Sequence, residues 1–264
     1  MKLLTGILFI LISCSLQAQD EFVKQLEASP RHQEYVEIMS NGRKLKCFVV
    51  YPQVSGKATS VIVIHENMGL TNWARSMTDQ IAAAGFIAIA PDLLSGMAPN
   101  GGGTQDFANV DSARQAIYKL DSAQVRKDLD AVYGYTNALA AANGKVAVAG
   151  FCWGGSQCFK MATTNSRIKG AFVFYGTGPE EISAVQKVSA PVYGFYGGSD
   201  ARVNATIPKS DSLMKAAGKT YDPTIYAGAG HGFMRAGQMA DASAENAKAR
   251  QEAFAKLVAK LNAL

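Results

Sequence analysis

The sequence has few cysteines and histidines, and it lacks a run of basic residues. Its 264 residues include 4 cysteines and 3 histidines. No two cysteines have the C-x-x-C spacing of a dithiol redox site, so a redox function is disfavoured. The net charge of +5 comes from scattered lysines and arginines without a basic run. Charge therefore gives no reason to expect a nucleic-acid partner, although it is compatible with small anionic substrates.

Long apolar runs are also absent, apart from one at the N-terminus that is too short to span a bilayer. Lys2 supplies a positive charge, Leu3–Ser13 is almost wholly apolar, and small or polar residues follow through Ala18-Gln19. This pattern is typical of a secretory signal. We therefore predict that residues 1–19 are a signal peptide and that the protein is exported, to the periplasm or to the medium.

Two processing sites fit this signal equally well. The run Leu11-Ile12-Ser13-Cys14 resembles a bacterial lipobox, in which Cys14 would carry lipid and anchor the mature protein to a membrane. Cleavage near Ala18 would instead release a soluble protein. An uncleaved N-terminus fits the pattern least.

Export would place the remaining cysteines in a compartment where disulfides form. Without Cys14 the chain keeps Cys47, Cys152 and Cys158, an odd number in an oxidising compartment, so one thiol must be free or externally paired. We expect Cys47 and Cys158 to be buried and inert. A disulfide between these two is the alternative that the sequence leaves open.

Strand and helix signals alternate along the mature chain. Asn41-Gly42 lies between two alternating runs, 35–39 and 44–51, and predicts an antiparallel hairpin. Buried strands are predicted at 60–64, 86–90, 145–149, 171–174, 192–196 and 224–226, and helices at 72–84, 121–141, 155–163 and 241–261, with Asp121 as an N-cap. This order predicts one α/β domain over residues 20–264, with a mostly parallel sheet covered on both faces.

A loop-rich segment, including Asn100–Thr104, lies between the predicted strand 86–90 and the predicted helix 121–141. Its length is typical of a mobile loop over a site, and equally of a surface insertion without a role.

The motif Gly150-Phe151-Cys152-Trp153-Gly154 follows a predicted buried strand and has the form of a G-x-S-x-G nucleophile elbow with cysteine in the serine position. The two glycines leave room for a sharp turn from strand to helix. Cys152 would then stand alone at the strand end, with the N–H of Trp153 pointing to where an oxyanion would form. The alternative is a glycine-rich turn around an inert buried cysteine.

A cysteine nucleophile needs a base. His231 lies in a glycine-rich loop between the last predicted strand and the terminal helix, where this architecture presents its base. We prefer it to His32, which lies in the polar N-terminal lead, and to His65, which closes a strand. A solvated loop histidine is the alternative for His231.

The base needs an orienting acid. Asp200 follows the predicted strand 192–196, and an isolated Gly-Gly-Ser-Asp would otherwise indicate only a turn. The order Cys152, Asp200, His231 is the nucleophile–acid–base order of α/β-hydrolases.

Together these motifs resemble the dienelactone hydrolase family of α/β-hydrolases over nearly all of the mature chain. The matching motifs are Gly150-Phe151-Cys152-Trp153-Gly154-Gly155, Pro91-Asp92-Leu93, Tyr196-Gly197-Gly198-Ser199-Asp200 and His231-Gly232-Phe233. The resemblance implies an α/β-hydrolase fold with Cys152 as nucleophile, His231 as base and Asp200 as its orienting acid.

The resemblance also assigns roles to two residues after the strand 60–64. Glu66 would contact the resting thiol and take part in its activation when substrate arrives. A carboxylate beside a thiol disfavours the thiolate, which keeps an idle cysteine less reactive. The backbone N–H of Asn67 would be the second oxyanion donor beside that of Trp153. A solvated strand end is the alternative for Glu66.

The expected substrate contacts match the family only in part. Members that cleave dienelactone hold the substrate carboxylate with two arginines, and Arg235 fits one of them. The other would fall in Leu94–Met97, which contains no arginine. Loss of a charge-assisted contact weakens anion binding, so dienelactone itself is a doubtful substrate. Tyr175 either lines the pocket or belongs to the core.

The sequence thus predicts an exported hydrolase of carboxylic esters or lactones that forms an acyl-cysteine intermediate and needs no metal or organic cofactor. Acyl transfer or thioester hydrolysis at the same site is the first alternative. A binding protein of the cell envelope that has lost turnover is the second.

Overall fold

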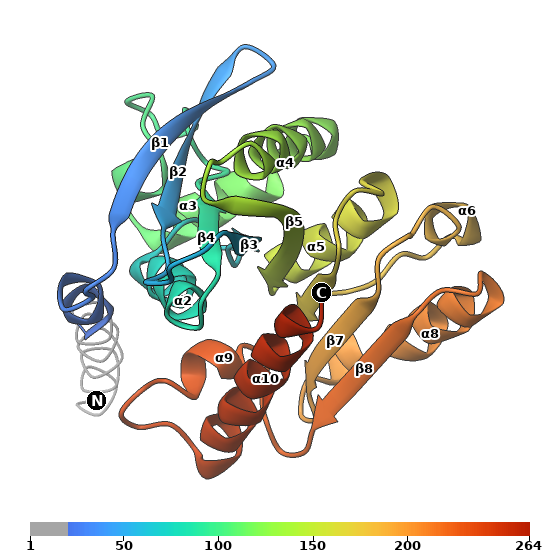
Figure 1. The fold of residues 1–264 in the computed structure, drawn as a ribbon. Coiled ribbons are helices and arrows are strands. Elements are labelled where there is room, and N and C mark those ends of the chain that lie inside the picture. The colour runs from blue at the N-terminus through green and yellow to red at the C-terminus, as the bar shows by residue number, and fades with distance from the viewer. Residues whose placement is uncertain (1–20) are drawn as a thin grey trace.

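The computed structural model describes residues 21–264, so the predicted signal with Cys14 and Ala18 lies outside the described residues. Its centre is one eight-stranded sheet with the strand order β1-β2-β4-β3-β5-β6-β7-β8 (Figure 1). In the part that is described, no helix combines the length and the apolar character needed to cross a membrane.

The sheet begins with the predicted hairpin. Strand β1 (Gln33–Ser40) pairs antiparallel with β2 (Arg43–Val50), and β2 pairs antiparallel with β4 (Ile87–Pro91). The turn residues Asn41 and Gly42 have φ of 48° and 85°. Two positive φ angles in a two-residue turn match the right-handed twist of the strands, which explains the Asn-Gly pair.

The other six strands run parallel to one another, which confirms the predicted mostly parallel sheet. They are β3 (Ala58–Ile64), β4 (Ile87–Pro91), β5 (Ala142–Phe151), β6 (Ala171–Phe174), β7 (Val192–Gly197) and β8 (Tyr221–Tyr226). The central strands are buried almost throughout because helices cover both faces.

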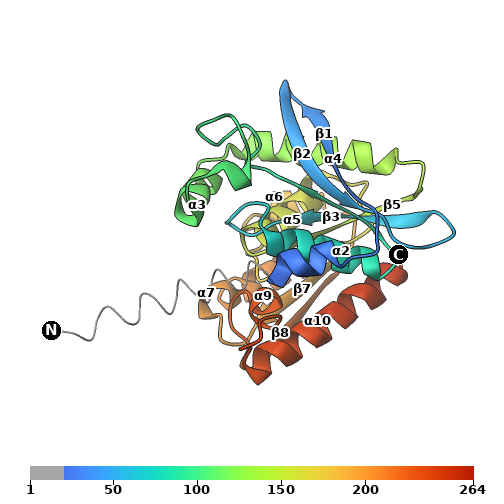
Figure 2. The same cartoon turned by 90° about the vertical axis from the view of Figure 1, so that its left-hand side faces the viewer.

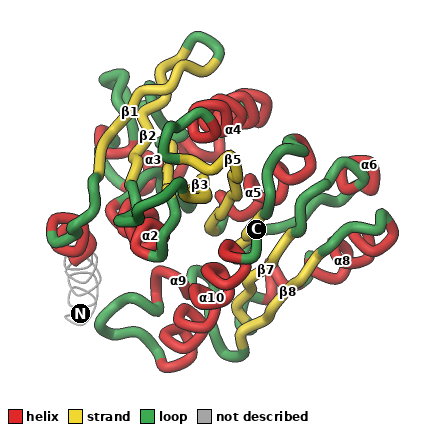
Figure 3. The backbone as a smooth tube through the Cα atoms, in the orientation of Figure 1, coloured by secondary structure: helices red, strands yellow, loops and turns green. Residues whose placement is uncertain are grey.

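Two hydrophobic clusters separate the helices by face. Helices α2 (Asn72–Ala83) and α10 (Ala244–Asn262) pack on one face, as does the helical segment 21–27. Helices α4 (Ser122–Asn137), α5 (Trp153–Thr164) and α8 (Ile207–Ala216) pack on the other. Figure 2 shows α4 and α10 on opposite sides of the strands, and Figure 3 shows how the loops join these layers.

The helix ends follow the capping chemistry. Asp121 caps α4 as predicted, since its carboxylate accepts the N–H of Gln124 at 2.7 Å. The helix ends at Asn137, earlier than expected, because Ala142 already pairs with Ala58 of β3. The terminal helix begins later than expected because Ser243 is its N-cap.

The predicted loop-rich segment contains structure that the sequence pattern did not indicate. It holds a short 3₁₀ helix, η1 (Thr104–Asp106), and the helix α3 (Val110–Tyr118). One face of α3 packs on Leu94 and lies against Trp153 of the elbow. The segment is therefore next to the predicted site, which favours a role there over an indifferent surface insertion.

Three further short helices connect these elements: α6 (Ile182–Val185), α7 (Ala201–Asn204) and α9 (Phe233–Ala236).

The turn from β5 to α5 depends on glycines for close contact. Cys152 has φ 56° and ψ −117°, a conformation that L-residues rarely adopt. A Cβ on Gly150 would collide with the carbonyl of Gly154, and a Cβ on Gly154 would collide with the carbonyls of Ile64 and His65. The helix can therefore begin against the end of β3 only because both residues are glycines, which have no Cβ.

This packing predicts opposite effects of one substitution at two glycines. Gly154→Ala should lower the free energy of unfolding by about 1–3 kcal/mol because backbone atoms must move apart. Gly134→Ala, the control, lies in α4 with no atom within 4 Å of the added Cβ. It should raise the free energy of unfolding by about 0.5–1 kcal/mol through helix propensity alone. Urea unfolding measures both, and a neutral Gly154→Ala would contradict the packing.

Candidate active site

Three side chains from three different loops form one hydrogen-bonded chain. The Nε2 atom of His231 lies 3.2 Å from the Sγ atom of Cys152, and its Nδ1 atom lies 2.5 Å from Oδ2 of Asp200. Cys152 follows β5, Asp200 follows β7 and His231 follows β8. The carboxyl ends of parallel strands meet at one edge of the sheet, which brings together these residues that are distant in sequence.

The loops that carry the acid and the base are joined to each other. The N–H of Ser199 donates to the carbonyl of Ala229 at 2.9 Å, and Gly197 packs closely on the carbonyls of 229 and 230. Asp200 is buried and caps α7, where its Oδ1 accepts the N–H of Val203 at 3.3 Å. One carboxylate oxygen is thus held by the backbone while the other faces His231.

The contact with sulfur changes the titration of His231. The hydrogen bond to Cys152 raises the pKa of His231 to about 9, with Asp200 acting in the same direction and burial opposing both. The raised pKa makes the imidazole a better base for the thiol proton. Once the imidazole holds that proton, its positive charge stabilises the negative charge left on the sulfur, which is the reactive form of a thiol.

The other two cysteines have different surroundings. Cys47 and Cys158 are free and fully buried, so the structure does not contain the disulfide that the sequence left open. Burial raises the pKa of both thiols well above the ordinary value. The sulfur of Cys158 faces the carbonyls of Val148 and Phe172 at 3.5 and 3.4 Å. Both are buried, as expected, whereas Cys152 is partly exposed.

Glu66 is close to this chain but has other partners. Its Oε2 accepts the Nε–H of Arg235 at 3.0 Å, and its Oε1 accepts the hydroxyl of Tyr175 at 3.4 Å. The resemblance implied a contact with the resting thiol, but the hydrogen bond of Cys152 in this structure is to His231. An arginine and a phenol occupy both oxygens of the carboxylate, which gives the physical reason for the difference.

Tyr175 connects the two groups. The residue is 1% exposed, and its ring packs edge-on against His231 with the ring centroids 5.1 Å apart. Its φ of 40° is also rare for a residue with a side chain. Burial, and next the negative charge of Glu66, raise the pKa of Tyr175 well above its ordinary value, so the phenol is neutral. Tyr175 is therefore both buried in the core and in contact with the site.

The two predicted oxyanion donors are backbone N–H groups, one at the start of α5 and one in the loop after β3. Trp153 is the first residue of α5 and Asn67 follows Glu66 at the end of β3. Among the described residues, no backbone carbonyl accepts a hydrogen bond from either N–H group. Both N–H groups are thus available to a ligand atom.

Two contacts at the site were not found by sequence reasoning. The side-chain amide of Asn67 donates to the hydroxyl of Tyr118 at 3.0 Å, which joins α3 to the loop after β3.

His65, which the sequence offers only as an alternative base, is fully buried, and both of its ring nitrogens lie against backbone groups. The third histidine, His32, lies on the surface as expected, with its side chain 67% exposed.

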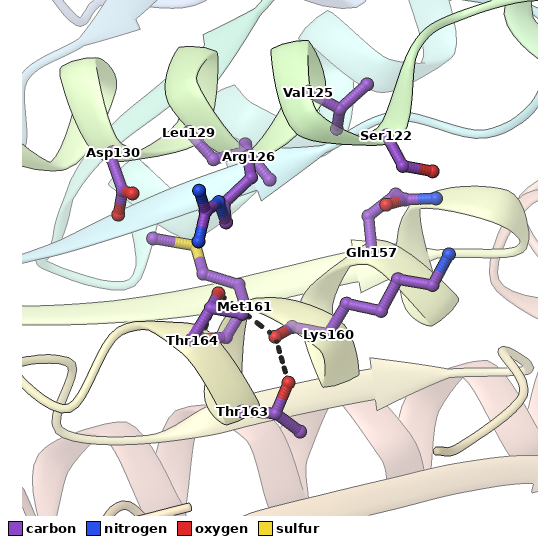
Figure 4. Close-up of a pocket in the computed structure, with 10 residues that line it drawn as sticks. All are labelled: Ser122, Val125, Arg126, Leu129, Asp130, Gln157, Lys160, Met161, Thr163 and Thr164. Atoms are coloured by element: carbon purple, nitrogen blue, oxygen red, sulfur yellow. Dashed lines mark hydrogen bonds between the residues drawn. The ribbon is translucent and has the colours of Figure 1, made fainter. Parts of the chain in front are cut away.

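A cavity of about 150 Å³ lies elsewhere, between α4 and α5 (Figure 4). Its lining residues are Ser122, Val125, Arg126, Leu129, Asp130, Gln157, Lys160, Met161, Thr163 and Thr164. Neither Cys152 nor His231 lines it, so it is separate from the hydrogen-bonded chain. Across residues 21–264 there is also no group of three or more His, Cys, Asp or Glu side chains that could hold a metal ion.

Solved structures of dienelactone hydrolase-like proteins share this arrangement of strands and helices. The dienelactone hydrolase-like promiscuous phosphotriesterase P91, from metagenomic libraries, is 23% identical and superposes with a TM-score of 0.75, covering 89% of this chain and 98% of that one. At this identity the likeness shows the fold, which is therefore the expected α/β-hydrolase fold.

Sequence comparison extends the likeness. A protein of Saccharolobus solfataricus named "Putative carboxymethylenebutenolidase" is 28% identical over 254 residues, covering 84% of this chain and 97% of that protein. A protein of the same name from Methylorubrum extorquens is 29% identical over 194 residues, covering 69% of this chain and 65% of that protein. The model of the dienelactone hydrolase family matches residues 45–264. The chain therefore belongs to the dienelactone hydrolase family, and it is a hydrolase of that type.

Proposed function

We propose that this protein hydrolyses carboxylic esters or lactones through an acyl-cysteine intermediate, with Cys152 as nucleophile, His231 as base and Asp200 as its orienting acid. The hydrogen-bonded chain from Asp200 through His231 to the sulfur carries the proposal. The strained conformation of Cys152 supports it, because such strain is typical of residues held for function.

In the first step His231 accepts the thiol proton and the sulfur attacks the carbonyl carbon. A C–S bond forms, and the electron pair of the carbonyl moves to its oxygen, which the N–H groups of Trp153 and Asn67 stabilise. When the intermediate collapses, the C–O bond to the leaving alkoxide breaks. The imidazolium of His231 then donates its proton to that alkoxide.

In the second step water attacks the thioester. His231, now neutral, accepts a proton from the water, and a second oxyanion forms between the same N–H groups. The C–S bond breaks, the carboxylic acid leaves, and the sulfur regains the proton held by His231. Asp200 keeps the imidazole oriented and stabilises its positive charge in both steps.

The first test removes the sulfur. Cys152→Ala should reduce turnover of aryl esters and small lactones by at least about 10³-fold, as expected for loss of a nucleophile. Cys158→Ala is the matched control, since that thiol is buried and away from the base, and it should keep activity in its folded fraction. Unchanged turnover in Cys152→Ala would contradict the proposal.

Thiol labelling separates an enzyme from a binding protein. In the wild-type protein iodoacetamide should modify Cys152 first, with activity lost in proportion to the label found by mass spectrometry. Slow and equal labelling at 47, 152 and 158 would instead favour a binding protein. Product analysis with competing alcohols distinguishes hydrolysis from acyl transfer.

We further propose that the acyl group of the substrate is uncharged. The guanidinium of Arg235 lies 3.0 Å from Glu66, which offsets its charge. The segment 94–97 supplies no second arginine. Arg235 uses only Nε in that contact, so its remaining donors can bind a neutral oxygen of the substrate.

A matched pair of lactones, with and without a carboxylate, tests the substrate charge. The neutral lactone should have the higher kcat/KM by about 10-fold or more, because one charge-assisted contact is missing for the anion. Arg235→Gln should lower kcat/KM for both lactones by similar factors. A preference for the anionic lactone that Arg235→Gln removes would show that the arginine binds a carboxylate.

Export is the last part of the proposal, and it rests on the pattern of residues 1–19. The full-length gene product made in a bacterial host should lose its N-terminus. Intact-mass analysis should give either a chain starting after Ala18 or a lipid-modified chain starting at Cys14. An unprocessed chain recovered from the cytoplasmic fraction would refute export.

A further inference from the structure

His65 follows the last residue of β3 and is fully buried, but the proposed chemistry does not use it. Its Nε2 atom accepts the backbone N–H of Leu93 at 3.3 Å, and its Nδ1 atom lies 2.7 Å from the carbonyl oxygen of Glu66. An N–H can only donate, so Nε2 is the acceptor and the ring proton is on Nδ1. The ring therefore donates to the carbonyl of Glu66.

This carbonyl belongs to the same peptide unit as the N–H of Asn67. A trans peptide is planar, and its C=O and N–H point in opposite directions. Fixing the direction of the Glu66 carbonyl therefore fixes the direction of the Asn67 N–H. A hydrogen bond accepted by the carbonyl also polarises the peptide and makes its N–H a stronger donor.

The same ring contacts the other side of the site. It stacks on the indole of Trp153, with the centroids 5.8 Å apart and the planes 14° apart. The carbonyl of His65 limits the space at Gly154, where a Cβ would collide with it. His65 thus lies between the loop after β3 and the first turn of α5.

The surroundings keep the ring neutral, as the hydrogen bond from Leu93 requires. Burial lowers the pKa of His65, and the negative charge of Asp92 and the nearby carbonyls only partly oppose it. The carbonyl of Glu66 has one other contact, from the N–H of Gly69 at 3.4 Å. That bond is longer than the one from His65, so the imidazole is the principal constraint on this peptide.

We infer that His65 is a positioning residue: its Nδ1–H holds the Glu66–Asn67 peptide so that the N–H of Asn67 faces the oxyanion. This inference rests on the acyl-cysteine chemistry proposed above. It assigns the buried histidine to transition-state stabilisation and not to proton transfer.

Two substitutions separate the two hydrogen bonds of the ring. The amide nitrogen of His65→Asn takes roughly the place of Nδ1 and can still donate to the carbonyl of Glu66. The amide of His65→Gln reaches the place of Nε2 and can accept from Leu93, but it leaves that carbonyl without its donor. Both variants lose the ring and its stacking on Trp153, so each controls for the other.

We expect His65→Gln to lower kcat for a neutral aryl ester by about 10–100-fold with KM within about threefold, as for a weakened oxyanion donor. His65→Asn should recover most of this loss. Alkylation of Cys152 by iodoacetamide should proceed at the wild-type rate in both variants, because displacement at a saturated carbon forms no oxyanion. Circular dichroism and urea unfolding measure the folded fraction used to normalise each rate.

Equal losses of kcat in the two variants, or alkylation that slows together with kcat, would overturn the inference and indicate general damage to the elbow. Full kcat in His65→Gln would overturn it as well. If Cys152→Ala keeps wild-type turnover, the acyl-cysteine chemistry itself fails. If Cys152→Ala is inactive and His65→Gln is fully active, only the role of His65 fails.

Discussion

The structure depends on one backbone constraint, the sharp turn at Cys152. With φ at 56°, the chain leaves β5 and starts α5 within one residue. This is sterically allowed only because Gly150 and Gly154 have no side chains to meet backbone carbonyls. Behind the turn, Phe151 stacks on Phe174 with ring centroids 4.6 Å apart, which ties the strand end to its neighbour. The sulfur is therefore presented by rigid elements and not by a flexible loop.

Around this turn the charged side chains form two groups, and Tyr175 contacts both of them. In the first, Asp200 orients His231 and the imidazole faces the sulfur. In the second, Glu66 pairs with Arg235. The buried ring of Tyr175 lies against the imidazole, and its hydroxyl donates to Glu66. Each buried carboxylate has a partner, so neither charge is left without compensation. Glu66 likewise offsets the charge of Arg235, although only Nε of the guanidinium takes part in that contact.

Much of the fold could be predicted because its signals are local. Asn-Gly fixes the hairpin turn, the buried runs mark the strands, and glycines at fixed spacing mark the elbow. The helix α3 was missed because its apolar face is short and its partners, Leu94 and Trp153, are distant in sequence. The helix α4 ends earlier than predicted because β5 already begins at Ala142, where it pairs with the distant Ala58. The helix α10 begins later because Ser243 caps it through the N–H of Asn246, a local signal that the prediction did not use.

The sequence by itself determined which residues could meet: a cysteine between glycines, then an acid and a histidine after successive strands, in the order that a parallel sheet brings to one edge. Only the tertiary structure decided how they pair. Glu66 could have faced the thiol, but Arg235 and Tyr175 hold it instead. His65 could have been a base, but backbone groups occupy both ring nitrogens. Local patterns fix the conformation of a turn, whereas hydrogen-bond partners depend on distances between segments that only folding brings together.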